Sequence, residues 1–187
     1  MRRRLALIVT LSFLSSLAMG LLGPIYPLFV LNRFSVTVID IGFILTVFGF
    51  SSAFFRIIAG RMVDIYGKEK IFLIGTLFGA ACSLTYIFVS NVIQLYLLEF
   101  ISGISCALED PARLAMIAEM GGRKRKGLLF GISESAYEIA GSLAALIAAI
   151  MVSNFGFESL FVACSGCQIM SGLVILSVSS KRFYGRK

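Results

Sequence analysis

The sequence predicts an all-α integral membrane protein with six transmembrane helices. Hydrophobic residues make up 58% of the 187 residues and charged residues only 14%, whereas soluble domains typically carry about 25% charged residues. The mean hydropathy is +0.94. The apolar residues form long blocks instead of short alternating runs, which excludes a transmembrane β-barrel. Because such a chain lacks the polar surface to stay in water, we expect the lipid bilayer to surround it.

Six apolar blocks define the expected spans. A bilayer core about 30 Å thick requires about 20 helical residues. The blocks, with the fourth extended by the residues that complete it, lie at about 5–31, 41–60, 71–89, 92–112, 127–152 and 160–180. No linker or low-complexity stretch divides them, so residues 1–187 are predicted to form a single six-helix membrane domain.

The basic residues predict the orientation, because cytoplasmic loops carry an excess of Lys and Arg. With the N-terminus inside, the inner segments at 2–4, 61–70, 113–126 and 181–187 hold 15 of the 17 Lys and Arg residues. Only Arg33 falls in an outer loop. We therefore expect a multi-pass protein of the cell (plasma) membrane with both termini in the cytoplasm. The same distribution argues against a nucleic-acid partner.

Enzymatic and metal chemistry have little support in the sequence. The chain contains no histidine, and all 4 cysteines lie inside apolar blocks. Cys164 and Cys167 have the spacing of a redox or metal motif, but no second cysteine pair follows at zinc-site spacing. Buried thiols that act as small apolar residues explain them better. No nucleophile–base constellation is recognisable, so we expect no enzyme, no resident metal and no cofactor.

Small residues are expected to mark helix–helix contacts, because they let helices approach each other in lipid. The second span carries one continuous stripe, formed by Gly42, Thr46, Gly49, Ala53, Arg56 and Gly60. The third span carries Gly75 and Gly79. The fifth span carries Gly127, Gly131, Gly141, Ala145 and Ala149.

Ionisable residues inside the spans are the candidate functional residues, because a charge near a helix centre costs at least ~2.5 kcal/mol on insertion scales. Glu99 and Glu138 lie deepest and are the strongest candidates. Glu134 and Arg56 lie about one turn inside the membrane, so they could instead reach the interface. Interfacial salt bridges explain Glu109, Asp110 and Arg113, near the cytoplasmic end, at least as well as a transport role does.

Polar faces on three helices predict a shared hydrated cavity. The first span contributes Ser12, Ser16, Gly20, Gly23 and Pro27, and the fourth contributes Glu99, Ser102, Cys106, Glu109 and Arg113. The fifth contributes Glu134 and Glu138, which repel each other unless a cation or a proton separates them.

The connection between the second and third spans carries the most specific motif, Gly60-Arg61-Met62-Val63-Asp64-Ile65-Tyr66-Gly67-Lys68-Glu69-Lys70. It resembles the signature of the major facilitator superfamily, Gly-x-x-x-Asp-(Arg/Lys)-x-Gly-(Arg/Lys)-(Arg/Lys). Ile65 and Glu69 depart from it at two basic positions. Gly23-Pro24-Ile25-Tyr26-Pro27 is similar to the Pro-x-x-Pro found late in the first helix of many members, and Tyr26 joins the candidate cavity residues.

The resemblance implies a fold of two six-helix halves, of which this chain supplies the N-terminal one. It further implies a transporter that moves a small solute by alternating access. In the family, the loop after the second span braces the inner gate, which would give this role to Gly60, Arg61, Asp64, Gly67, Lys68 and Arg113. Asp64 would latch the outward-open state. Many proton-coupled members carry an arginine where this chain has Glu99, so the usual scheme of drug/proton antiport does not transfer directly.

The resemblance does not specify where the second six-helix half comes from. It can be a missing C-terminal part, a separate chain or a second copy. A non-transporting six-helix protein that serves as an interaction or regulatory module is the alternative function.

Overall fold

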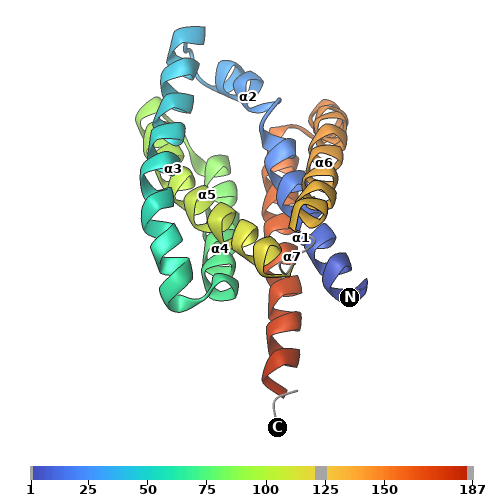
Figure 1. The fold of residues 1–187 in the computed structure, drawn as a ribbon. Helices are drawn as coiled ribbons and strands as arrows, with labels where there is room; N and C mark the ends of the chain where they lie inside the picture. Colours follow the sequence, from blue (N-terminus) through green and yellow to red (C-terminus); the bar gives the residue numbers. More distant parts are fainter. Residues whose placement is uncertain (1, 121–125, 185–187) are drawn as a thin grey trace.

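The computed structural model describes residues 2–120 and 126–184, which are helical apart from short connections (Figure 1). Side chains are described for residue 6, for residues 9–119 and for residues 127–177. The basic clusters predicted to face the cytoplasm at 2–4, 123–126 and 181–187 therefore lie outside the described side chains. The helical elements are α1 (Arg2–Leu22), α2 (Tyr26–Arg33), α3 (Val38–Tyr66), α4 (Lys68–Thr85), the 3₁₀ turn η1 (Tyr86–Phe88), α5 (Val92–Met120), α6 (Lys126–Phe155) and α7 (Phe157–Tyr184).

Six segments within the described residues are long and apolar enough to cross a membrane. They are Val9–Arg33, Val38–Tyr66, Lys68–Phe88, Val92–Glu119, Gly127–Phe155 and Phe157–Ser177. These segments match the six predicted blocks in order, and most of them extend the block at one or both ends. The fold is therefore an all-α integral membrane protein with six transmembrane segments.

The first transmembrane segment is divided into α1 and α2 and is not one continuous helix. The break falls at Gly23, Pro24 and Ile25. Proline has no backbone N–H and disfavours helical geometry in the residue before it, so a helix ends readily there. Pro27 then occupies the first turn of α2, where the missing N–H costs nothing. The break turns Tyr26 and Phe29 toward the interior, where both are buried.

Local sequence signals also fix where α3 begins and ends. Thr37 and Asp40 form a reciprocal capping box, in which the Thr37 N–H donates to Asp40 Oδ2 at 2.8 Å and the Asp40 N–H donates to Thr37 Oγ1 at 3.3 Å. Gly67 ends the helix with φ +93° and ψ 139°. This backbone conformation is essentially restricted to glycine, which confirms the tight turn predicted at Gly67.

We expect Gly67→Ala to lower stability by about 2 kcal/mol, because a Cβ atom would strain this backbone. No neighbouring atom lies within 4 Å of the position that the Cβ atom would occupy, so strain and not collision would cause the loss. Thermal unfolding of the purified protein measures it. Gly166→Ala is the matched control, because Gly166 lies inside α7 with equally open surroundings. Equal melting temperatures for the two variants would contradict the strain argument.

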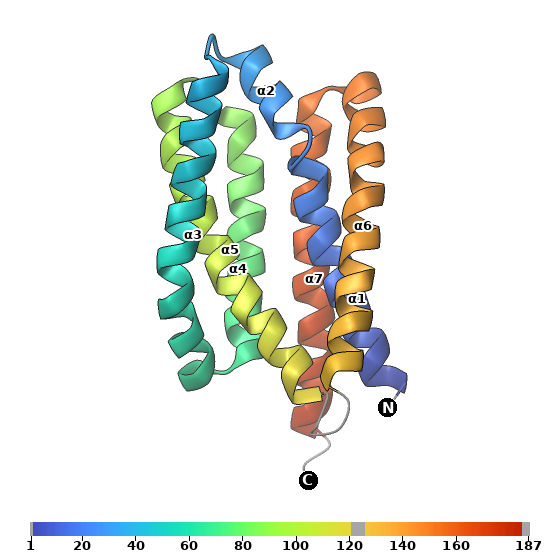
Figure 2. The ribbon, with the colours of Figure 1, turned by 45° about the horizontal axis from the view of Figure 1, so that its top comes forward.

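The helices form two groups that lie side by side (Figure 2). One group contains α3, α4 and α5, and the other contains α1, α6 and α7; α4 packs on α7 and joins them. The start of α1, the end of α7 and the α3–α4 turn lie at the same end of the bundle (Figure 2), which we call the termini end. The turn η1 and helix α2 lie at the opposite end (Figure 2).

Glycines confirm the predicted close contacts at some positions and not at others. A Cβ atom at Gly75 would lie 2.9 Å from the Glu109 backbone, and one at Gly79 would lie 2.7 Å from Ser105 Oγ and from Gln168 Nε2. These glycines therefore let α4 pack tightly on α5 and α7. A Cβ atom at Gly141 would lie 3.0 Å from Ser16 Oγ, which places this residue at the contact between α1 and α6.

The second span, which is α3, was predicted to pack on its neighbours through its stripe of small residues. This prediction is wrong within the described residues. A Cβ atom added at Gly42, Gly49 or Gly60 would meet nothing within 4 Å. The face of α3 that packs on α5 instead carries Ser51 and Ser52, which are buried. The start of α6 shows the same correction, since Gly127 and Gly131 also face open space. Further along α6, the buried alanines are Ala140, Ala144 and Ala148, one position before the predicted Ala145 and Ala149.

Candidate substrate cavity

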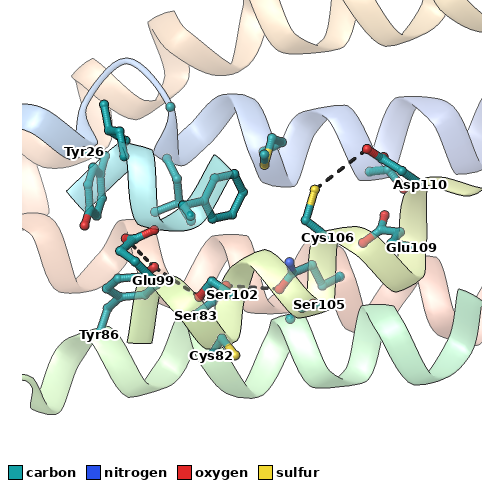
Figure 3. Close-up of a pocket in the computed structure, with 18 of the residues that line it drawn as sticks. Tyr26, Cys82, Ser83, Tyr86, Glu99, Ser102, Ser105, Cys106, Glu109 and Asp110 are labelled. Carbon is teal, nitrogen blue, oxygen red and sulfur yellow. Dashed lines mark hydrogen bonds between the residues drawn. The ribbon is translucent and has the colours of Figure 1, made fainter. Parts of the chain in front are cut away.

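A cavity of about 200 Å³ lies between the two helix groups (Figure 3). The apolar lining residues Met19, Leu22, Leu45 and Phe48 come from α1 and α3, and α5 contributes the polar residues Glu99, Ser102, Ser105, Cys106, Glu109 and Asp110. The lining consists of Ser15, Met19, Leu22, Gly23, Tyr26, Leu45, Phe48, Gly79, Cys82, Ser83, Tyr86, Glu99, Ser102, Ser105, Cys106, Glu109, Asp110, Tyr137 and Gln168. Each of the six transmembrane segments contributes at least one of these residues.

Glu99 lies at the end of the cavity near α2 and η1. Its side chain is 4% exposed. The Tyr86 hydroxyl donates a hydrogen bond to Glu99 Oε1 at 2.6 Å and lies 3.2 Å from Ser102 Oγ. The Tyr26 hydroxyl points toward the same carboxylate (Figure 3). A buried carboxylate is therefore surrounded by two phenols and a serine.

Aromatic rings enclose this end of the cavity. The Tyr26 ring meets the Tyr86 ring edge to face at a centroid distance of 6.0 Å. Tyr86 stacks on Phe161 at 5.2 Å, and Phe161 meets Phe29 edge to face at 4.8 Å. Such pairs add packing energy beyond the burial of their area. The cluster holds α2, η1 and α7 together, and it positions the Tyr26 and Tyr86 hydroxyls at Glu99.

The other end of the cavity contains Glu109 and Asp110, about 15 Å further along α5 at 1.5 Å per residue. Asp110 pairs with Arg56 of α3, whose Nη2 lies 2.6 Å from Asp110 Oδ2. Glu109 forms no salt bridge within the described residues. The buried Ser15 hydroxyl of α1 lies beside Glu109.

The cavity is acidic. Its lining contains Glu99, Glu109 and Asp110 and neither lysine nor arginine. Of these carboxylates, only Asp110 has a basic partner among the described residues. Because an unpaired buried charge is costly in a medium of low polarity, the arrangement favours a proton or a positively charged ligand at the other two carboxylates.

The structure brings only two of the five predicted cavity residues, Glu99 and Tyr26, into the cavity lining. Arg56 lies outside it and pairs with Asp110. Glu134 pairs with Arg113, and Glu138 is exposed on α6. The predicted polar face of the first span is also divided, since Ser12, Ser16 and Gly20 pack against α6 whereas Ser15 and Gly23 line the cavity.

The predicted gating residues lie at or near the termini end but do not form one cluster. Asp64 and Arg61 are exposed at the end of α3, and Asp64 forms no ion pair within the described part of the chain. Lys68 forms a salt bridge with Glu119, which joins α4 to α5. Arg113 is buried and binds Glu134 of α6 at 3.1 Å, so it does not pair with Asp64.

Sequence reasoning missed Tyr86 and Gln168. Tyr86 lies in a 3₁₀ turn at the edge of an apolar block, where no helical periodicity marks it. Gln168 of α7 accepts a hydrogen bond from Ser83 at 3.1 Å and lines the cavity. Neutral polar residues inside apolar blocks were the available signal, but such residues are common in membrane helices and do not by themselves mark a cavity.

The bundle of six apolar segments around an internal cavity defines a multi-pass membrane protein. The family model of the Major Facilitator Superfamily matches residues 8–182. The chain belongs to the major facilitator superfamily, which confirms the resemblance seen in the Gly60–Lys70 motif.

Several relatives carry transporter names. An uncharacterized MFS-type transporter of Methanocaldococcus jannaschii is 27% identical over 163 residues, which cover 87% of this chain and 42% of the relative. Multidrug resistance protein MdtG of Klebsiella pneumoniae is 26% identical over 173 residues, which cover 90% of this chain and 42% of the relative. Multidrug resistance protein 1 of Bacillus subtilis is 26% identical over 132 residues, which cover 71% of this chain and 34% of the relative. The chain thus spans less than half the length of these relatives, and the family and their names support a role in membrane transport.

Proposed function

We propose that this chain is the N-terminal half of a secondary transporter that moves a small solute across the cell membrane by alternating access. The observation that carries the proposal is the cavity between two helix groups, with three carboxylates in its lining, in a chain of this family. Both termini would lie in the cytoplasm, as the distribution of basic residues predicts. Two relatives are named multidrug resistance proteins, which favours a small organic solute.

A second six-helix half would complete the site. Transporters of this kind bind substrate near the membrane midplane between two repeats. The cavity of about 200 Å³ is smaller than the ~300–1,000 Å³ of most ligand pockets. The exposed side of α3 carries Gly42 and Gly49, and the exposed side of α6 carries Ser135 and Glu138. Because lipid does not solvate a carboxylate, these faces favour contact with a second half.

Asp64 would act at the inner gate. It lies exposed at the end of α3, one turn before the α3–α4 turn. A carboxylate there can bind N–H groups or basic side chains of the second half in one state and release them in the other. Lys68, fixed to Glu119, would hold the turn in place.

Transport by reconstituted vesicles tests the proposal. Vesicles that contain the assembly with its second half should take up at least one of two probes, ethidium or chloramphenicol, faster than empty vesicles. Asp64→Asn should slow that uptake several-fold without reducing the amount of folded protein. Glu158→Gln is the control, since Glu158 is exposed at the start of α7 and lies outside the cavity. Uptake equal to that of empty vesicles for both probes would refute this function.

A further inference from the structure

Gln168 of α7 is the only residue of the described cavity lining that carries side-chain N–H groups. The other polar residues of the lining carry carboxylates, hydroxyls or thiols, and an ionised carboxylate can only accept hydrogen bonds. Three of the hydroxyl groups already donate within the protein, those of Tyr86, Ser83 and Ser105. A solute whose polar group is a hydrogen-bond acceptor would therefore find its N–H donors at Gln168.

A hydrogen bond from α4 orients the carboxamide group of Gln168. Ser83 Oγ donates to Gln168 Oε1 at 3.1 Å. Ser83 Oγ also lies 3.3 Å from the Sγ atom of Cys164, which precedes Gln168 by one turn of α7. Because the amide oxygen accepts from Ser83, the N–H bonds of Nε2 point away from that hydroxyl. Within the described part of the chain, Nε2 donates no hydrogen bond of its own.

Gly79 of α4 leaves room for this amide group at the cavity. A Cβ atom on Gly79 would lie 2.7 Å from Gln168 Nε2 and 2.7 Å from Ser105 Oγ. Any side chain there would collide with the amide nitrogen, so the missing side chain lets a residue of α7 reach the cavity beside α5. Ser105 lies between Glu99 and Glu109 along the cavity (Figure 3). The amide group is therefore placed between the two acidic ends.

We propose that Gln168 Nε2 donates a hydrogen bond to an uncharged acceptor oxygen of the transported solute, such as the carbonyl oxygen of a ketone or an amide. The inference rests on the proposed function and names a specificity-determining residue of the same cavity. Ser83 is a positioning residue, because it acts through the amide group and not on the solute.

The energetics of burial explain why this donor would select the solute. A carbonyl group that leaves water for an enclosed cavity loses its hydrogen bonds to water, and this loss is costly unless a donor replaces them. The rest of such a solute would contact the apolar residues of the lining, which are Met19, Leu22, Leu45 and Phe48. A lining with these residues and acceptors alone would favour a hydrocarbon over a ketone of the same shape.

Binding of acetophenone to the complete assembly in nanodiscs tests the role of Gln168. The matched hydrocarbon is α-methylstyrene, in which a methylene group replaces the carbonyl oxygen, and empty nanodiscs correct for partition into lipid. We expect Gln168→Met to weaken binding of acetophenone about fivefold, as the loss of one hydrogen bond between neutral groups predicts. The same variant should leave binding of α-methylstyrene unchanged, because methionine keeps an unbranched side chain of similar length.

Two further variants sharpen the test. Ser83→Ala frees the carboxamide to rotate, so it should weaken acetophenone binding less than Gln168→Met does and should not affect the hydrocarbon. Gln94→Met is the matched control, since Gln94 is exposed on α5 and lies outside the cavity. It should bind both probes like the unaltered protein. The thermal melting temperature of each variant shows whether the fold is intact.

The outcomes separate this inference from the proposed function. If Gln168→Met leaves acetophenone binding unchanged, or weakens both probes equally, the inference is wrong even when vesicles transport chloramphenicol. If acetophenone binding depends on Gln168 but neither ethidium nor chloramphenicol is transported, the donor site stands and the transport function fails. An unaltered assembly that binds no more acetophenone than empty nanodiscs do would also overturn the inference.

Discussion

Replacing Gly20 by leucine is expected to destabilise the fold severely, with a larger effect than the loss of any one salt bridge or turn glycine. Gly20 of α1 lies at a contact between backbones, where a Cβ atom would meet Gly141 Cα at 2.8 Å, Gly141 O at 2.9 Å and Ala144 Cβ at 2.9 Å. Neither backbone can move aside without shifting a whole helix. Forcing a larger side chain into a packed contact costs about 1–3 kcal/mol and occasionally more.

The loss at Gly20 would extend to neighbouring hydrogen bonds between the same helices. Ser12 Oγ lies 2.6 Å from Ser133 Oγ, with both residues fully buried, and Ser16 donates to the Tyr137 carbonyl. Separation of α1 from α6 would leave these groups unpaired, at about 1–3 kcal/mol each. We therefore expect a total loss of about 5 kcal/mol.

Size-exclusion chromatography and thermal unfolding in detergent measure this loss. Gly166→Leu is the matched control, because the same substitution inside α7 meets no atom within 4 Å of the Cβ position. A Gly20→Leu protein that is as stable as Gly166→Leu would show that the backbones of α1 and α6 do not meet here.

The contrast between Gly20 and the α3 stripe shows what the sequence could reveal about the fold. Span positions and the Gly67 turn follow from local hydropathy, charge and glycine conformation, and the structure agrees with them. Helical periodicity tells which residues share a face, but not which neighbour that face meets. Gly42 and Gly49 therefore looked like packing residues, although Ser51 and Ser52 make the contact with α5.

The candidate site was predictable only in part, for a related reason. Glu99 could be selected because its depth in a span makes its charge costly whatever its surroundings. Glu138 was selected by the same argument, but the rotation of α6 exposes it, away from the cavity. Tyr86 carries no charge and lies more than ten residues from Glu99, so the hydrogen bond between them depends on how α5 packs against η1.

Glu134→Gln is also expected to destabilise the fold, through the loss of a salt bridge between α5 and α6. Arg113 of α5 is buried, and its Nη1 donates to Glu134 Oε1 at 3.1 Å while its guanidinium lies 4.6 Å from the centre of the Tyr137 ring. Its Nε has no hydrogen-bond partner among the described residues. Loss of the Glu134 charge would leave a buried cation without its salt bridge. Because breaking a fully buried pair costs about 3–5 kcal/mol and Glu134 is half-exposed, we expect about 2 kcal/mol.

Glu138→Gln is the control for this prediction, since Glu138 lies one turn further along α6 and forms no ion pair in the described part of the chain. A double variant makes the test sharper. Arg113→Met combined with Glu134→Gln removes both charges and should recover part of the stability that Glu134→Gln loses, because replacing both partners costs less than leaving one charge buried. If the double variant is less stable than Glu134→Gln alone, then the packing of Arg113 on Tyr137, and not the charge pair, joins α5 to α6.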